Sequence, residues 1–243
     1  ELIQLPSETI STARAQVIHN SADAAAETVD IWLNDQMLLD DFSFRTASPF
    51  VDVPAGEDID ISILPPNSMD TNGAIAKFTY NLMGNGKYIL IASGIVSGSG
   101  YNPPEPFNIY VYDMAREMAN SSDNSDVLVM HGSTDAPVVD VVEVAQGAGT
   151  IVDNIAYSEF AGYLELPTAD YSLQIRNSAG TDVVAQFGAP LATLGLDGAA
   201  MAVVASGFLN PGNNSGGPAF GLYVALPSGG ELVELPSEVI STA

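Results

Sequence analysis

Two short motifs contain residue types that could carry out nucleophilic or acid–base chemistry. Both have the pattern His-x-Ser-x-Asp, and their residues are His19, Ser21, Asp23, His131, Ser133 and Asp135. Nucleophilic catalysis needs a base in contact with the serine and a site that stabilises an oxyanion. The Gly-x-Ser-x-Gly elbow of many serine hydrolases does not occur in the sequence. We therefore interpret both motifs as turns, in which Asp and Ser bond the backbone and His ends a strand. No residue is predicted to be catalytic.

Metal binding is the second chemistry to consider. Two His residues in separate copies and no Cys make a zinc site improbable. Calcium needs several oxygens close together, and four pairs of acids could supply them: Asp23 with Asp30, Asp40 with Asp41, Asp58 with Asp60, and Asp123 with Asp126. None lies in an Asp-x-Asp-x-Asp-Gly loop, so solvated surface charge is the simpler interpretation. If Ca²⁺ is bound, we expect it near Asp113, Asp123 and Asp126, where it would stiffen a linker. No other cofactor is predicted.

Two equivalent loops are the candidates for ligand binding. Residues 97–106 are rich in Pro, and residues 210–218 are rich in Gly and Asn. Long loops at the ends of a sandwich often carry binding residues, which here would be Tyr101, Asn102, Glu105, Asn213 and Asn214. The alternative interpretation is a plain connector. The single Trp of the chain, Trp32, argues weakly against a carbohydrate platform, since such platforms usually present several aromatic side chains.

The motifs recur because the chain contains two diverged copies of one unit. His19 and His131 are 112 positions apart, and residues 107–112 match residues 220–225 at a spacing of 113. Each copy has about seven short segments, several of alternating polarity, separated by turn residues, as in an immunoglobulin-like architecture. We predict an all-β chain of two tandem antiparallel sandwiches, at residues 14–113 and 126–235, joined by a polar linker at 114–125.

The same motifs resemble a family of bacterial and archaeal proteins known only as domain of unknown function 4397. The resemblance rests on His-x-Ser-x-Asp-Ala followed by a Val-Asp strand, which begins with Val29-Asp30 in one copy and Val139-Asp140 in the other. The second copy keeps Asp-Ala-Pro at residues 135–137, and the first keeps Pro-Ala-Gly at residues 54–56. The resemblance implies a secreted or cell-surface β-sandwich, often in tandem, with no known activity.

The two ends of the chain repeat each other. Residues 1–13 and 231–243 are identical at ten of thirteen positions, so we infer one period of a tandem array of 230 residues (231 minus 1). Residues 1–13 would then be a linker or edge strand from the preceding period, and residues 236–243 would begin the next one. We expect residues 1–5 to pair with a sheet edge and to report the contact between periods.

Composition narrows the class of protein further. The chain has 30 acidic residues against 6 Lys and Arg, a net charge of −24, and 47% hydrophobic residues. Such a protein can bury a core, but it repels nucleic acid and anionic lipid, and its apolar runs are too short to span a membrane. We predict an extracellular structural repeat of an adhesin, stalk or filament, with neighbouring copies as partners, end-to-end contacts and no enzyme activity. The alternative is a module that binds a glycan or protein through residues 97–106 and 210–218.

Overall fold

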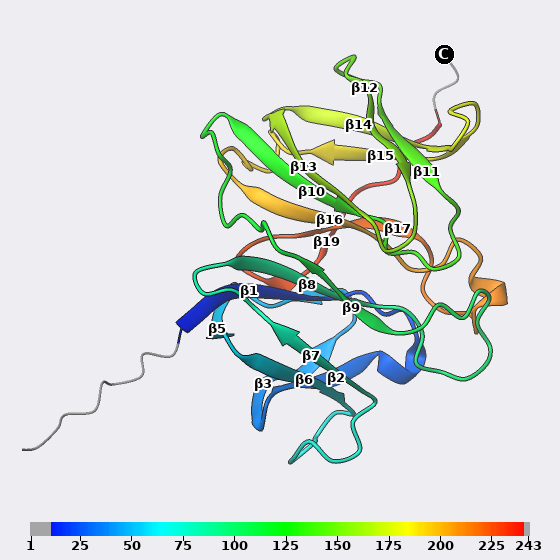
Figure 1. Ribbon diagram of the computed structural model, residues 1–243. Helices are drawn as coiled ribbons and strands as arrows, with labels where there is room; N and C mark the ends of the chain where they lie inside the picture. The colour runs from blue at the N-terminus through cyan, green and yellow to red at the C-terminus, as the bar shows by residue number, and fades with distance from the viewer. Residues whose placement is uncertain (1–10, 241–243) are drawn as a thin grey trace, which may run out of the picture.

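The chain folds into four stacked β-sheets, which confirms the predicted all-β class (Figure 1). The computed structural model describes residues 11–240. The only helices in this range are two single 3₁₀ turns, η1 (Ala24–Ala26) and η2 (Pro211–Asn213). Neither of them is long and apolar enough to cross a membrane.

The first sandwich consists of a four-stranded outer sheet and a larger inner sheet. Its strands are β1 (Ser11–His19), β2 (Thr28–Leu33), β3 (Gln36–Ser43), β4 (Thr46–Ala47), β5 (Val51–Ala55), β6 (Asp58–Leu64), β7 (Ala76–Asn81), β8 (Lys87–Ser93) and β9 (Asn108–Tyr112). The outer sheet has the order β3-β2-β6-β7. In the inner sheet β4 and β5 both pair with β1, which lies parallel to β8 and is followed by β9. Ile31, Ile59 and Leu90 belong to the core between these sheets.

The second sandwich repeats this arrangement. The strands that follow are β10 (Asn124–Met130), β11 (Val139–Glu143), β12 (Gly149–Ile155), β13 (Phe160–Pro167), β14 (Asp170–Asn177), β15 (Val183–Pro190), β16 (Ala200–Ser206), β17 (Gly221–Ala225), β18 (Gly230–Glu231) and β19 (Val233–Glu234). All of them belong to the second sandwich except β18, which pairs with β4 of the first. The inner sheet has the order β13-β10-β16-β17-β19, and the outer sheet has the order β12-β11-β14-β15. As in the first sandwich, the opening strand β10 lies parallel to its neighbour β16.

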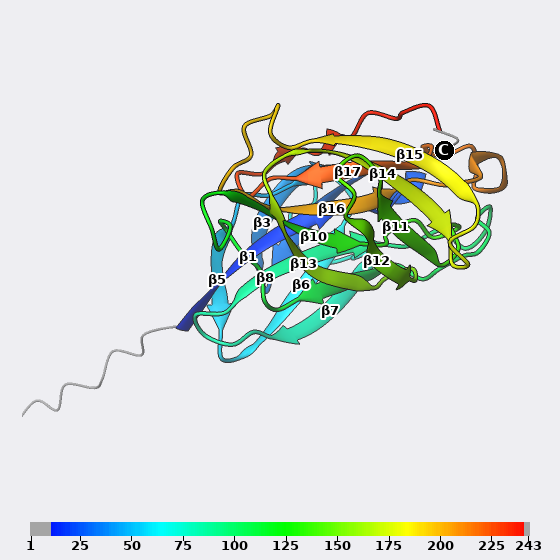
Figure 2. The ribbon, with the colours of Figure 1, turned by 90° about the horizontal axis from the view of Figure 1, so that it is seen from above.

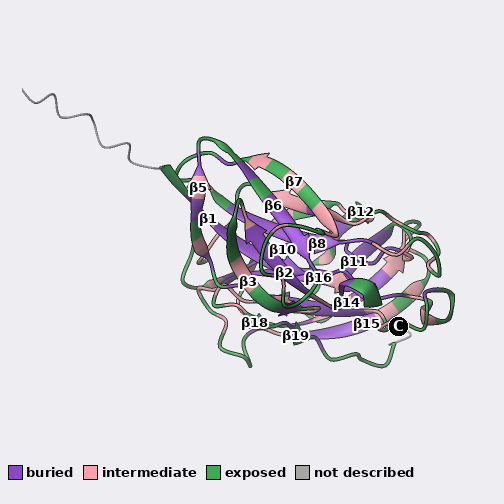
Figure 3. Ribbon diagram, turned by 90° about the horizontal axis from the view of Figure 1, so that it is seen from below, coloured by how far each residue is buried: buried purple, intermediate pink, exposed green. Residues whose placement is uncertain are grey.

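The two sandwiches pack face to face through their inner sheets (Figures 1 and 2). A third apolar core fills this interface. Ile18 and Ile91 contribute from the first sandwich, and Leu128, Met130 and Val204 contribute from the second, each at most 1% exposed. Strands β1, β8, β10 and β16 are therefore covered on both faces and are mostly buried (Figure 3). The outer strand β7 instead alternates between half-buried and exposed residues.

The last described residues of the chain run over both sandwiches. β18 pairs with β4 of the first sandwich, and β19 pairs with β17 of the second. Ser237 then forms a bridge with Phe187 on the edge strand β15. Residues 230–231, which we had assigned to the second sandwich, thus extend a sheet of the first. Residues 236–238, which we had assigned to the next period, lie on the second sandwich.

Candidate functional site

In the first His-x-Ser-x-Asp motif, Asp23 holds two distant segments together. Asp23 is 1% exposed, and its carboxylate accepts hydrogen bonds from the backbone N–H groups of Ala25, Val96 and Ser97. The hydroxyls of Ser97 and Tyr101 donate two more, at 2.7 and 2.9 Å. Burial alone would raise the pKa of Asp23, but these hydrogen bonds outweigh it and hold the pKa below its ordinary value. Asp23 therefore fastens the turn after β1 to the loop at residues 97–106.

The second motif forms the equivalent set of bonds. Asp135 accepts from the backbone N–H groups of Leu209 and Asn210, both at 2.7 Å, and from the side chain of Asn214 at 3.0 Å. Ser133 donates to the carbonyl of Gly207, as Ser21 does to that of Gly94. The two copies thus use one device to fix the loop between their penultimate and last long strands.

The two histidines are buried and bond to backbone carbonyls. Nε2 of His19 lies 2.7 Å from the carbonyl oxygen of Ala26, and Nδ1 accepts from the backbone N–H of Ser21. Because Nδ1 accepts, Nε2 carries the proton and the ring is neutral. Burial lowers the pKa of His19 to about 4. His131 makes the corresponding contact with Pro137, and burial lowers its pKa too. Neither imidazole contacts its serine hydroxyl, so the geometry that activates a nucleophile is not formed.

The two candidate ligand loops contact each other. The backbone N–H of Asn102 donates to Oδ1 of Asn214 at 2.9 Å, and the hydroxyl of Ser215 donates to the carbonyl of Gly100. The rings of Tyr101 and Phe208 lie 5.6 Å apart. Tyr101 and Asn214 occupy equivalent positions of the two copies, 113 residues apart, and each donates a hydrogen bond to the Asp of its own motif. Asn102 and Asn213 remain exposed, whereas Glu105 is half-buried.

The linker is fixed to both sandwiches by ion pairs. Glu117 pairs with Arg14 and Lys87 of the first sandwich, at 2.8 and 3.2 Å. Its neighbour Arg116 pairs with Asp126 and Glu165 of the second, at 2.6 and 2.7 Å. The pKa of Glu117 is lowered, chiefly by its hydrogen bond from Arg14. Asp126, one of our candidate calcium ligands, therefore has an arginine as its partner, and Asp113 and Asp123 are exposed. In residues 11–240 these three acids do not form a metal-sized cluster.

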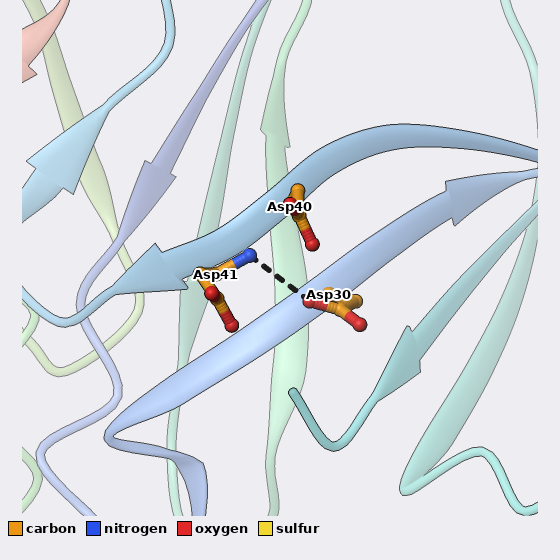
Figure 4. A group of neighbouring side chains, drawn as sticks. All are labelled: Asp30, Asp40 and Asp41. Carbon is orange, nitrogen blue, oxygen red and sulfur yellow. Dashed lines mark hydrogen bonds between the residues drawn. The ribbon is translucent and has the colours of Figure 1, made fainter. Parts of the chain in front are cut away.

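The carboxylates of Asp30, Asp40 and Asp41 do form such a cluster in the described part of the chain (Figure 4). However, Asp30 is fully buried and already accepts from the backbone of Asp41 and from the backbone and hydroxyl of Ser68. The equivalent Asp140 accepts in the same way from the backbone of Asn154. Asp41 and Asn154 both have positive φ, 48° and 53°. The shared role of Asp30 and Asp140 is thus to stabilise an irregular turn of the neighbouring strand.

Sequence reasoning missed Arg45, Asn20 and the pair Arg116–Glu117. The guanidinium of Arg45 lies 3.8 Å from the ring centre of Tyr223 and donates to Ser206 and Ala219 of the other sandwich. Asn20 donates to the carbonyl of Gly132 across the same interface. For the charged residues, the sequence did contain one signal. Only 6 Lys and Arg accompany 30 acids, so each cation has many acidic residues as potential partners.

A cavity of about 70 Å³ lies in the second sandwich. Its lining is apolar except for His131 and Tyr171, and it includes Leu164, Leu173 and Phe220. The cavity therefore offers few of the hydrogen-bonding groups that a polar ligand such as a glycan requires.

A family model matches residues 13–142 and again residues 125–209, so it covers most of the chain in two overlapping copies. The chain belongs to the family described as domain of unknown function (DUF4397). This finding confirms the resemblance seen in the motifs. A search of curated proteins found no match.

Solved structures give distant matches to this DUF4397 chain. The Bacillus anthracis TIE protein matches at 12% identity and a TM-score of 0.26, over 81% of this chain and 34% of its own length. A structure described as alpha-glucan binding by a streptococcal virulence factor matches at 9% identity and a TM-score of 0.25, over 79% of this chain and 92% of its own. The chain thus spans about a third of the length of the first structure. Scores of this size carry no functional argument.

Proposed function

We propose that the chain is a structural repeat unit of a long extracellular adhesin, stalk or filament, without catalytic activity. The observation that carries this proposal is the thirteen-residue repeat at positions 1–13 and 231–243, with ten identities. Its second copy lies across both sandwiches as far as Glu238. A segment that recurs once per period and binds the whole unit is what a tandem array requires.

The unit's construction supports a mechanical role. Two sandwiches that share a buried third core cannot move independently without exposing apolar surface to water. The linker is held by ion pairs on both sides, and the loops at residues 97–106 and 210–218 bond to each other. This proposal needs no bound ion. Melting with and without Ca²⁺ tests that point, because an ion that binds only the folded state must raise the Tm.

The alternative function is binding of a glycan or protein through the two loops. The loops use much of their polar capacity on each other and on Asp23 and Asp135, which leaves Asn102 and Asn213 as exposed candidates. Trp32 is 9% exposed and donates to Ser68, so it offers no open stacking surface. A glycan and protein screen on the unit separates the two functions. A ligand whose affinity falls on Asn102→Ala or Asn213→Ala would favour the binding module.

The coding sequence on either side of this unit tests the structural proposal most cheaply. Further copies at a period of 230 residues are expected, and electron microscopy of the purified product should then show rods whose length increases with copy number. Flanking sequence without any further copy would contradict the proposal. Surface labelling of intact cells would test the extracellular location.

A further inference from the structure

The end segment, defined as residues 231–238, is bound as an added strand along three sheet edges. The backbone N–H of Leu232 donates to the carbonyl of Arg45 at 2.8 Å, and that of Leu235 donates to Leu222 at 2.9 Å. On β15, Gly188 donates to the carbonyl of Pro236, and Glu238 donates to Gln186. Backbone pairing of this kind supplies affinity, and side-chain pockets supply specificity.

Two leucines of the end segment occupy such pockets. Leu232 is 8% exposed and belongs to the core between the sandwiches, whereas Leu235 is 2% exposed and belongs to the core of the second sandwich. At the far end, the carboxylate of Glu238 accepts from the hydroxyl of Ser172 and from the side chain of Gln186. The segment therefore contacts the sandwiches through three side chains, two of them apolar and one polar.

The identities between the two ends of the chain coincide with these contacts. Leu232, Leu235 and Glu238 are repeated as Leu2, Leu5 and Glu8, and Pro236 and Ser237 as Pro6 and Ser7. The positions that differ are Val233, Glu234 and Val239, where residues 3, 4 and 9 have Ile, Gln and Thr. All three are exposed; Val233 is 41% and Val239 is 93% exposed. The repeat thus preserves the three side chains that dock, Leu232, Leu235 and Glu238, and its three substitutions fall at exposed positions, although Glu234 also contacts Tyr223.

We infer that residues 1–8 are a docking segment for a second copy of this unit. On that copy they would occupy the surface formed by β4, β17 and β15, with Leu2 and Leu5 in the two apolar pockets and Glu8 beside Ser172. The inference deepens the proposed structural role. It depends on that role only for the statement that the second copy is the preceding period.

This docking has a consequence for the junction between periods. The last backbone bond of the end segment is donated by Glu238. Residues 241–243 repeat Ser11, Thr12 and Ala13, with which β1 begins. Only positions 239 and 240 would therefore separate the anchored segment from the first strand of the next sandwich. A connection of two residues allows little relative movement, so successive periods would follow each other at a fixed angle.

The test uses a labelled peptide of residues 1–13 and the full chain with Leu235→Asp, which weakens the chain's own end segment. Fluorescence anisotropy measures binding, with unlabelled peptide 231–243 as competitor. The natural peptides differ only at exposed positions, so their affinities should agree within about threefold. A peptide with Leu2→Asp and Leu5→Asp should bind at least about 30-fold more weakly, because both carboxylates would enter apolar pockets.

Because the Leu235→Asp chain could fail to fold, a second form of the protein is tested as well. In the otherwise natural chain, a protease site inserted after the exposed Ser228 is cut after folding, and the bound fragment is then exchanged against the labelled peptide. Binding of neither natural peptide, or equal binding of the Leu→Asp peptide, would overturn the inference. If flanking periods exist but peptide 1–13 does not bind, the structural role stands without this docking. Binding without flanking periods would keep the docking as a contact between separate chains.

Discussion

At the scale of single residues, Asp23 and Asp135 are the carboxylates that fasten the loops of their sandwiches. Asp23 accepts five hydrogen bonds from residues of the turn and of the loop at 97–106. A buried carboxylate surrounded by donors cannot be replaced by a neutral amide, because an amide N–H would then face other N–H groups. The motif's pattern and its turn were predictable from the sequence. Its partners 73 to 78 positions away were not, since nothing local specifies them.

Asp23→Asn is therefore expected to lower the free energy of unfolding by about 2–4 kcal/mol. Asp135→Asn should act similarly in the second sandwich. The control is Asp35→Asn, at an exposed carboxylate, which should change stability by less than about 0.5 kcal/mol. Urea denaturation measures all three. Equal, small effects would mean that Asp23 does not fasten the loop.

His19 makes stability depend on pH in a definite direction. Its pKa is about 4 in the folded protein, against 6.5 in the unfolded chain, so the unfolded state binds more protons between these values. Stability is then lost as the pH falls through this window, by about 3 kcal/mol when complete. His19→Gln retains a donor for Ala26 without the titration. Its stability deficit relative to the natural chain should shrink by about this amount between pH 7 and pH 4. A constant deficit would contradict the assignment.

At the scale of elements, the strands that lie between the two sandwiches differ in sequence pattern from the exposed edge strand β7. The alternating strand β7 lies at the edge of an outer sheet, whereas β8 and β16 are nearly continuous apolar runs that are buried on both faces. This contrast was present in the sequence and indicates the face-to-face packing that we did not predict. The pairing of β18 with β4 could not be predicted, because a two-residue strand carries no periodicity.

Gly229 lets the chain cross from the second sandwich to β4. It has φ of 71°, and a Cβ there would lie 2.4 Å from the backbone nitrogen of Pro49. Gly147 has a similar φ of 78° with open space around it, so it is a matched control. Gly147→Ala should cost about 1 kcal/mol, the cost of the left-handed conformation alone. Gly229→Ala should cost about 2–4 kcal/mol, because the clash with backbone adds to it. It should also speed amide exchange at Leu232, and unchanged exchange there would contradict the close approach.

At the scale of the whole molecule, one core joins the two sandwiches, so they should unfold together. Trp32, the single tryptophan, reports the first sandwich, and Met130, 1% exposed, lies on the second sandwich's side of the interface. Met130→Ala is expected to lower the free energy of unfolding by about 2–5 kcal/mol. Trp32 fluorescence and circular dichroism should register the same shift. A Trp32 transition that stays in place would mean that the sandwiches are independent.

Charge acts at this scale as well. A net charge of −24 disfavours association with anionic partners, and the few cations concentrate where the sandwiches and linker meet. The overall charge and its consequences were predictable from composition. The positions of Arg45, Arg116 and Lys87 were not, because they depend on how the two copies are placed relative to each other.

The central claim is that this unit continues into the next period without a flexible joint. A chain of two consecutive periods tests it directly, because the sequence has no Cys and labels can be introduced freely. Spin labels at Asp197→Cys of the first period and Asn72→Cys of the second give a distance distribution by pulsed electron paramagnetic resonance. Both sites are exposed. The account predicts a single narrow distribution, which broadens when Leu235→Asp is introduced into the first period. A broad distribution in the natural chain would contradict it.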